Sequence, residues 1–132
     1  MAGWDWQIVF DGGSRGNPGL GYGSYRLRPR DGEWSAPTRL DFGGRVTNNE
    51  AEYKALLAAL TDLGRRVPRP ETVRVEVIGD SKLVLSQMRG DWRIRAANLR
   101  QLANLGMALA ARFQGVTYRW QPRAESVRLL GH

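Results

Sequence analysis

The chain has 132 residues, 42% of them hydrophobic and 25% charged, a composition typical of one folded domain, which we expect to span residues 1–132. Cysteine is absent and the single histidine, His132, is the last residue. Disulfide frameworks, thiolate metal sites and cysteine nucleophiles are therefore excluded, and a histidine-based triad is disfavoured. The 20 basic residues outnumber the 13 acidic ones, and the resulting net charge of +7 favours polyanionic partners such as nucleic acids.

The sequence shows no sign of a membrane segment or of a secretory leader. No apolar run approaches the roughly 18 residues that a membrane-spanning helix needs. Residues 1–11 include Asp5 and lack the basic start of a signal peptide. We therefore expect a cytoplasmic protein without a membrane partner. Nothing in the pattern requires a protein partner either, so a monomer is expected.

The first third of the chain predicts strands separated by turns. Three apolar or alternating segments predict strands over residues 7–10, 22–27 and 33–42. The glycine-rich residues 12–19 predict a turn, because glycine and proline interrupt regular structure. Asp31 and Gly32 predict a hairpin turn, and Pro37 predicts an irregular or edge position in the third strand.

Helices and strands alternate in the remainder. A capping box formed by Thr47 and Glu50 predicts a helix start, and Gly64 predicts its C-cap. The predicted segments are a helix over residues 51–63, a strand over 73–78, a short helix ending near Gly90, a helix over 94–113, a strand over 116–120 and a stub of helix over 125–130. Strands reached through helices are expected to run parallel to the first strand, which gives a mixed α/β sheet covered by helices.

Three carboxylates are expected to meet at one edge of this sheet. Asp11 follows the first strand and Asp80 follows the fourth, and neighbouring parallel strands end at the same edge. Glu52 lies in the first turn of the capped helix and can lean over that edge. Separately, Asp11 would be a turn former, Asp80 a helix N-cap and Glu52 a helix-dipole partner. Together, without histidine or cysteine, they suit two hard divalent ions about 4 Å apart, as in phosphodiester hydrolysis.

Three motifs carry a resemblance to a known family. They are DGGSRGNPG at residues 11–19, TNNEAEY at residues 47–53 and GDSKLV at residues 79–84. In this order and spacing, the chain resembles the type 1 ribonuclease H family over nearly its whole length. The resemblance implies an α/β ribonuclease H-like fold, with a five-stranded mixed sheet ordered 3-2-1-4-5 and helices on both faces. It also implies an endonuclease that uses two Mg²⁺ or Mn²⁺ ions to hydrolyse the RNA strand of RNA–DNA hybrids.

The resemblance assigns metal binding and catalysis to Asp11, Glu52 and Asp80. Glu52 occupies the catalytic position, whereas the neighbouring Glu50 is the capping-box residue. The tail departs from the family pattern, because Leu130 stands where a fourth metal-binding aspartate is expected.

Other tail residues are candidates for completing the metal site. Ser126 stands where the family has an asparagine, and the usual final helix is expected to be missing. Glu125, His132 or water would then fill the position of the missing ligand.

Further positions match the substrate-binding residues of the family. Asn17 and Asn49 match residues that read the hybrid from its minor groove. Arg45 and Thr47, with Asn17, match a pocket for a phosphate of the DNA strand. Trp92 matches an aromatic residue that packs on DNA sugars, although its neighbour Ile94 equally allows a core position. The remaining matches in the substrate-binding set are Gly12, Gly13, Ser14 and Ser81.

A second departure is the absence of room for the basic protrusion that some family members insert after the short helix. Hybrid affinity is then expected to depend on distributed arginines, which in this region are Arg89, Arg93, Arg95 and Arg100.

Two alternatives to the hybrid-cleaving endonuclease remain open. Leu130 motivates a catalytically weakened or inactive module that binds hybrids or duplexes. Another nuclease of the same superfold, such as a junction resolvase or an exonuclease, would also place acidic residues at this sheet edge. The G-x-G steps of residues 19–23 do not indicate dinucleotide binding, because a strand follows them where that motif needs a helix.

Overall fold

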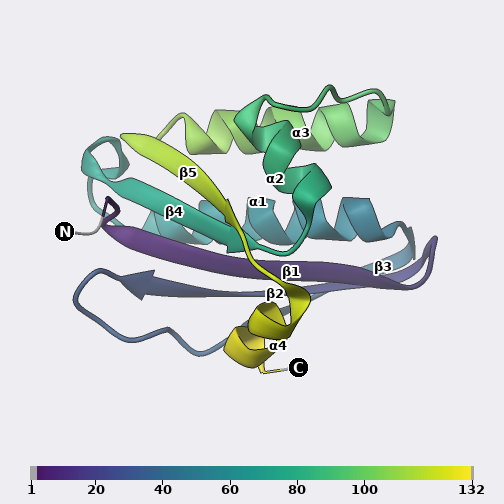
Figure 1. Cartoon of the computed structure of the whole chain (residues 1–132), viewed down its shortest axis with the longest axis horizontal. Helices are drawn as coiled ribbons and strands as arrows, with labels where there is room; N and C mark the ends of the chain where they lie inside the picture. Colours follow the sequence, from purple (N-terminus) through teal and green to yellow (C-terminus); the bar gives the residue numbers. More distant parts are fainter. Residues whose placement is uncertain (1–2, 132) are drawn as a thin grey trace.

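The computed structural model describes residues 3–131, which form a five-stranded sheet with helices on both faces (Figure 1). The strands are β1 (Trp6–Gly16), β2 (Gly19–Pro29), β3 (Thr38–Val46), β4 (Arg74–Gly79) and β5 (Gly115–Trp120). The helices are α1 (Asn48–Arg66), the short 3₁₀ helix η1 (Pro70–Thr72), α2 (Lys82–Arg89), α3 (Ala97–Ala110) and α4 (Arg123–Leu130). No helix among the described residues is long and apolar enough to cross a membrane.

The strand order is β3-β2-β1-β4-β5, as expected. β1 pairs antiparallel with β2 and parallel with β4, and β4 pairs parallel with β5. The expected directions of the fourth and fifth strands are therefore confirmed. Pro37 directly precedes β3, which is an edge strand and begins five residues later than the predicted third strand.

The prediction of a turn over residues 12–19 is wrong. β1 continues to Gly16 and pairs with β2 residue by residue up to the Gly16–Gly19 pair, which leaves only Asn17 and Pro18 as the turn. Gly12 shows why glycine is needed inside this strand. A Cβ there would lie 2.4 Å from the backbone carbonyl carbon and oxygen of Ala51, so only glycine lets α1 pack so closely on β1.

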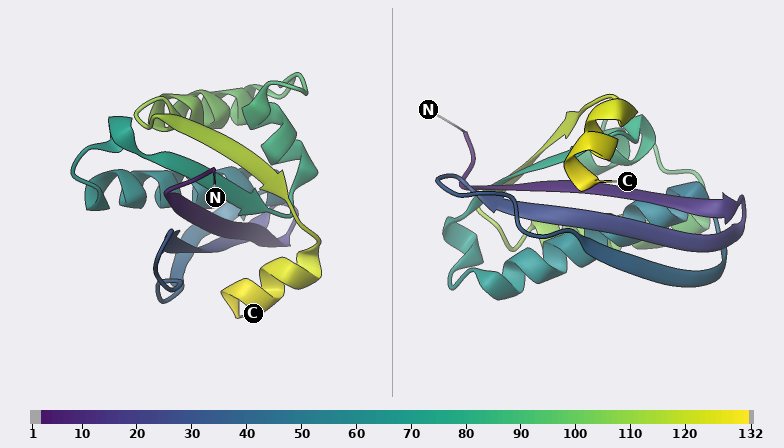
Figure 2. Two further views of the ribbon diagram at one scale, coloured as in Figure 1. Left: turned by 60° about the vertical axis from the view of Figure 1, so that its left-hand side comes forward. Right: turned by 90° about the horizontal axis from the view of Figure 1, so that it is seen from below.

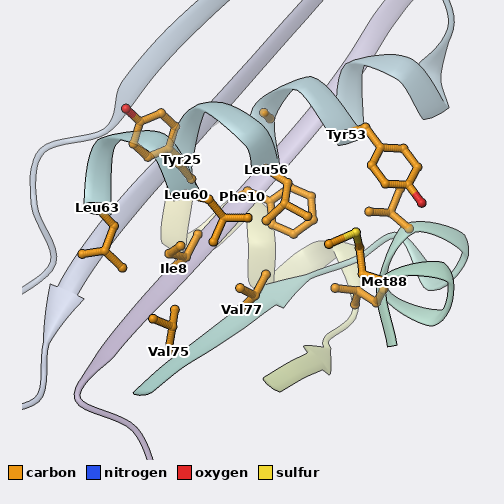
Figure 3. Packing of buried hydrophobic residues seen from close by; sticks show 14 of the residues in the cluster. Ile8, Phe10, Tyr25, Tyr53, Leu56, Leu60, Leu63, Val75, Val77 and Met88 are labelled. Atoms are coloured by element: carbon orange, nitrogen blue, oxygen red, sulfur yellow. The ribbon is translucent and has the colours of Figure 1, made fainter. Parts of the chain in front are cut away.

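One face of the sheet carries the main core. α1 lays Tyr53, Leu56 and Leu60 over Ile8 and Phe10 of β1, and all five side chains are fully buried (Figure 3). This spacing of three and four residues is the apolar stripe of a helix that packs on a sheet. The core thus fixes α1 lengthwise above β1, with its N-terminal turn at the edge where β4 ends.

The helix boundaries were predicted in part. Thr47 caps α1, its hydroxyl accepting from the main chain of Glu50 while the Glu50 carboxylate accepts from the main chain of Thr47. The predicted C-cap at Gly64 is wrong, because the helix continues to Arg66 and Val67 closes it. Gly90 closes α2 in the left-handed conformation, as predicted, and no helix intervenes before α3.

The stub of helix predicted over residues 125–130 is present and begins two residues earlier, so the further expectation that the final helix is missing is wrong. α4 spans Arg123–Leu130 and lies on the face of the sheet opposite α1 (Figure 2). Leu130 and Val9 are both fully buried, and the Arg26 side chain donates to the main-chain oxygen of Leu129 at 2.7 Å. A leucine in the last turn gives this short helix an apolar anchor, which explains why it forms.

Candidate active site

Three carboxylates from three elements meet where β1 and β4 lie side by side. Asp11 lies within β1, Asp80 follows β4, and Glu52 lies in the first turns of α1. One carboxylate oxygen of each residue lies within 4.8 Å of the corresponding atoms of the other two. The close packing of α1 on Gly12 brings Glu52 to this edge. The juxtaposition expected from the sequence is therefore present.

Burial and mutual repulsion perturb the acids of this cluster. Desolvation raises the pKa of Glu52 well above its ordinary value, and the charges of Asp11 and Asp80 raise it further. Desolvation and the charge of Asp11 also raise the pKa of Asp80, although Arg123 opposes this. Such shifts are typical of acids placed together for a cation or for proton transfer.

Arg123 supplies a positive charge to the cluster. Its Nη1 donates to both carboxylate oxygens of Asp11, at 3.2 and 3.3 Å, and to Oδ2 of Asp80 at 3.3 Å. The contact depends on α4, whose first residue is Arg123. Sequence reasoning missed this arginine, because only the docking of α4 on the sheet reveals its position.

Trp120 and Lys82 form a second feature that sequence reasoning missed. The indole N–H of Trp120 donates to the main-chain oxygen of Asp80 at 3.1 Å, and the Lys82 ammonium lies 4.5 Å from the centre of the indole ring. Trp120 remains 42% exposed, so this pair forms part of the surface beside Asp80. The end of β5 therefore helps to hold the main chain at the Asp80 corner.

Ser81 is the N-cap of α2, and its hydroxyl accepts from the main chain of Val84 at 3.2 Å. This settles the alternative role considered for Asp80, whose side chain is not the cap. The Ser81 hydroxyl thus fixes the helix that follows Asp80 and leaves the aspartate carboxylate in the cluster.

The candidate substrate-binding residues gather around the N-terminus of α1. Asn17, in the β1–β2 turn, accepts from the main chain of Asn48 at 3.0 Å, and the Asn48 side chain accepts from the main chain of Ser14 at 2.8 Å. Asn49 is exposed on the first turn. These contacts hold the β1–β2 hairpin against the start of the helix.

Arg45 and Thr47 flank the same helix start. Arg45 is exposed and adopts a left-handed backbone conformation with φ of 61°, which is uncommon for a residue other than glycine. Thr47 uses its hydroxyl in the cap, where the oxygen accepts from the main chain of Glu50 and the hydroxyl also bonds the Glu50 carboxylate. A guanidinium and a helix N-terminus together are suited to an anion.

The structure decides between the two positions left open for Trp92 and shows what surrounds Gly13. Trp92 is 50% exposed in the loop between α2 and α3, so the core alternative for this residue is wrong. At Gly13, a Cβ would lie 2.5 Å from the Tyr22 hydroxyl, so the missing side chain makes room for that tyrosine.

The tail does not bring a fourth carboxylate to the cluster within residues 3–131. Glu125 is absent from the acidic group, and its carboxylate instead accepts from Arg128 at 2.7 Å. Leu130 is fully buried, and the Ser126 hydroxyl accepts from the side chain of Gln121 at 3.1 Å. His132 lies outside the described residues.

The donor set fits hard divalent cations. All three ligand residues are carboxylates, and Oε2 of Glu52 is buried without a hydrogen-bond partner in the described part of the chain. A buried carboxylate oxygen without a partner is costly, and a cation would satisfy it. Oxygen ligands alone favour Mg²⁺ or Mn²⁺ over metals that prefer nitrogen or sulfur.

Comparisons with known proteins agree with this geometry. Residues 9–127 match the family described as Reverse transcriptase-like. The chain is 39% identical over 120 residues to the bifunctional protein Rv2228c of Mycobacterium tuberculosis, covering 90% of this chain and 32% of that protein. It is 38% identical over 122 residues to ribonuclease HI of Halobacterium salinarum, covering 90% of this chain and 57% of that protein. The chain thus spans about one third to just over half the length of these relatives.

Solved structures extend the similarity to the fold. RNase H1 from Halobacterium salinarum superposes with a TM-score of 0.84 at 35% identity, over 93% of this chain and 89% of that one. LC11-RNase H1 in complex with an RNA/DNA hybrid gives 0.85 at 28% identity, with the same two coverages of 93% and 89%. The N-terminal RNase H domain of Rv2228c gives 0.81 at 36% identity, over 92% of this chain and 86% of that one. On the agreement of sequence, fold and acidic cluster, the chain belongs to the type 1 ribonuclease H family.

Proposed function

We propose that this protein is a metal-dependent endonuclease that hydrolyses the RNA strand of RNA–DNA hybrids. The observation that carries the proposal is the cluster of Asp11, Glu52 and Asp80, whose ligand atoms lie within 4.8 Å of one another. The net charge of +7 supports a polyanionic substrate. Relatives named RNase H1, one of them in complex with an RNA/DNA hybrid, share the fold.

The three carboxylates would hold two Mg²⁺ or Mn²⁺ ions. When bound, such ions activate a water and stabilise the leaving oxygen of a phosphodiester. The protein itself fixes the positions of the ligands. β1 and β4 hold Asp11 and Asp80 as neighbours, and the packing of α1 on Gly12 holds Glu52 against them.

The residues around the start of α1 would grip the hybrid. Asn17 and Asn49 would read the minor groove, where the 2′-hydroxyl distinguishes RNA from DNA. Arg45 and Thr47 would hold a phosphate of the DNA strand beside the helix N-terminus. Trp92, half-exposed beyond α2, would pack on the sugars of that strand.

The second candidate function is a hybrid-binding module with little or no turnover. The observation that favours it is Leu130, because leucine cannot ligate a metal and the structure puts no other described carboxylate in the cluster. We also propose that the protein acts in the cytoplasm as a monomer.

Product analysis separates these candidates. A hybrid with labelled RNA and DNA strands is incubated with the protein in Mg²⁺, in Mn²⁺ and in EDTA. Internal RNA fragments that appear only with metal support the endonuclease, whereas binding without products supports the module. Cleavage of the DNA strand, or of a branched DNA in preference to the hybrid, would show that both proposals are wrong.

A further inference from the structure

A pocket of about 490 Å³ opens beside the acidic cluster, on the face of the sheet that carries α4. Its lining residues come from β1, β2, β3 and the start of α4, and they are Arg15, Tyr22, Gly23, Arg39, Leu40 and Arg123. The volume falls within the range of about 300–1,000 Å³ that is usual for ligand sites. All three charged residues of the lining are arginines.

Two of the three arginines, Arg15 and Arg39, carry positive charge that is not neutralised locally, whereas Arg123 pairs with Asp11 and Asp80. Arg15 and Arg39 are exposed and make no salt bridge within residues 3–131, whereas Arg74, for example, is paired with Asp5. A carboxylate nearby, Asp41, lines an adjacent hollow with Arg15 and accepts from the main chain of Gly43. Arg15 and Arg39 outnumber this one carboxylate, so their end of the pocket favours an anion.

Tyr22 gives the pocket an aromatic wall. It pairs with Gly13 across β1 and β2, and its hydroxyl occupies the space that a Cβ at residue 13 would need. An aromatic ring beside arginines offers stacking together with charge, which is the combination that nucleic-acid strands use.

Ser24, on the same face of the sheet, has a buried hydroxyl without a hydrogen-bond partner among the described residues. Ser24 pairs with Asp11 on β1 and with Arg39 on β3, so it lies between the acidic cluster and the pocket arginine. The residue is 1% exposed. A buried hydroxyl of this kind is usually satisfied by an ordered water, and Ser24 itself does not line the pocket.

Arg123 connects the pocket to the acidic cluster. The same side chain lines the pocket and donates to Asp11 and Asp80. A nucleic-acid strand whose phosphodiester reaches the cluster would therefore pass directly into the pocket. In the proposed function, the RNA strand is the one whose phosphodiester reaches the cluster.

We propose that the pocket formed by Arg15, Tyr22 and Arg39 is a phosphate subsite for the RNA strand, next to the bond that is cleaved. This inference rests on the proposed function for the choice of strand. The site is separate from the residues around the start of α1, because Arg39 and Tyr22 lie on the opposite face of the sheet from α1.

The test measures binding of an RNA–DNA hybrid in EDTA by fluorescence anisotropy, so cleavage plays no part. The variants are Arg15→Ala and Arg39→Ala. Arg65→Ala is the matched control, because Arg65 is exposed, makes no salt bridge within residues 3–131 and lies 13 residues along α1 from Glu52, about 20 Å away. We expect the dissociation constant to rise roughly tenfold for each pocket variant and less than twofold for the control.

A scan of neutral methylphosphonate linkages then identifies the contacted strand. We expect one RNA linkage, close to the cleaved bond, at which a methylphosphonate weakens hybrid binding by wild type. At the same linkage it should cause no further loss of affinity in Arg39→Ala. Equal hybrid affinities for the pocket and control variants would overturn the proposal. It would also be overturned if the losses of affinity from the methylphosphonate and from Arg39→Ala were additive at every RNA linkage. If the two losses of affinity were non-additive only at a linkage of the DNA strand, the choice of the RNA strand would be overturned.

Two further measurements distinguish a subsite for the RNA strand from a site for free phosphate and from a failure of the proposed function. Inorganic phosphate is titrated calorimetrically; binding that Arg39→Ala abolishes, with hybrid affinity unchanged, would mean a free-anion site and would overturn the strand subsite. Cleavage with metal is measured in parallel, and we expect KM to rise with kcat little changed. If wild type fails to cut the hybrid, the proposed function fails, whereas the EDTA binding result still decides the subsite.

Discussion

The guanidinium of Arg123 lies 3.2 Å from the carboxylate of Asp11, although 112 positions separate the two residues in the chain. The Asp11 side chain is fully buried, whereas that of Arg123 is 60% exposed. The arginine therefore reaches from the surface to an acid that solvent does not reach. Because the same atom also contacts Asp80, it lies between two of the proposed metal ligands and must compete with an ion for them.

Replacing Arg123 with alanine is expected to lower stability in EDTA and to strengthen Mn²⁺ binding. The acids lose their counter-charge, but the exposed arginine is screened by solvent, so the free energy of unfolding should fall by only about 1 kcal/mol. Chemical denaturation and calorimetric titration of Mn²⁺ measure the two effects. Arg128→Ala, which removes an arginine of α4 that pairs with Glu125, is the control. Unchanged Mn²⁺ affinity would show that Arg123 does not compete with the ion.

Asp11→Asn is expected to abolish cleavage and to leave hybrid binding intact or stronger. The change removes a proposed metal ligand and also reduces repulsion between the cluster and phosphate. Gel analysis of products and anisotropy in EDTA give the two results. Asp31→Asn, in the exposed loop after β2, removes the same charge away from the cluster. Cleavage by Asp11→Asn at the wild-type rate would remove Asp11 from the catalytic machinery.

Leu130→Asp is expected to lower the metal concentration needed for cleavage, because it restores an acid where the family has one. The cost is stability, since the side chain is fully buried, and we expect a loss of about 2–4 kcal/mol without metal. Added Mn²⁺ should recover part of that loss. Leu130→Asn is the control for packing.

The same titrations compare the two ions for the unmodified protein. With one anionic ligand fewer, we expect Mn²⁺ to support faster cleavage than Mg²⁺, because Mn²⁺ tolerates irregular coordination better. Saturation of wild type at low Mg²⁺, with no gain from Leu130→Asp, would mean that residue 130 does not stand at a ligand position.

Two substitutions at Arg45 separate its charge from its backbone conformation. Arg45→Gly and Arg45→Ala both remove the guanidinium, so each should weaken hybrid binding more than single-stranded RNA binding and reduce its salt dependence. Only glycine relieves the left-handed φ of 61°. We therefore expect Arg45→Gly to be about 1 kcal/mol more stable than Arg45→Ala. Equal hybrid affinity of wild type and both variants would contradict a phosphate contact.

Asp5 gives a pH-dependent test of how β1 and β4 are joined. Hydrogen bonds from the Arg74 side chain and main chain hold the pKa of Asp5 below its usual value near 3.8. A lowered pKa means stability that is present above the unfolded value and lost as the pH falls through the folded one. Asp5→Asn should thus destabilise the protein at neutral pH, and the difference should vanish at strongly acidic pH. A difference that persists there would point to a cause other than charge.

The sequence alone was enough to predict that Asp11, Glu52 and Asp80 meet at one edge of the sheet. The ends of two parallel strands and three short motifs point to these acids, and local spacing predicts the capping box of Thr47 and Glu50. These features depend on residues close together in the chain, so their pattern survives in the sequence. The strand order 3-2-1-4-5 followed from the resemblance to the ribonuclease H family, and the structure confirms it.

The surroundings of these residues depend on how distant segments pack, which the folded structure alone shows. The glycine-rich segment is a strand and not a turn, because β2 and α1 supply the pairing and the close packing that glycine permits. α4 forms because the sheet buries Leu130, and its docking carries Arg123 to Asp11. The arginine pocket with Tyr22 arises in the same way. Each of these features depends on contacts between segments that are far apart in the chain. A local sequence pattern contains no information about the energies of those contacts.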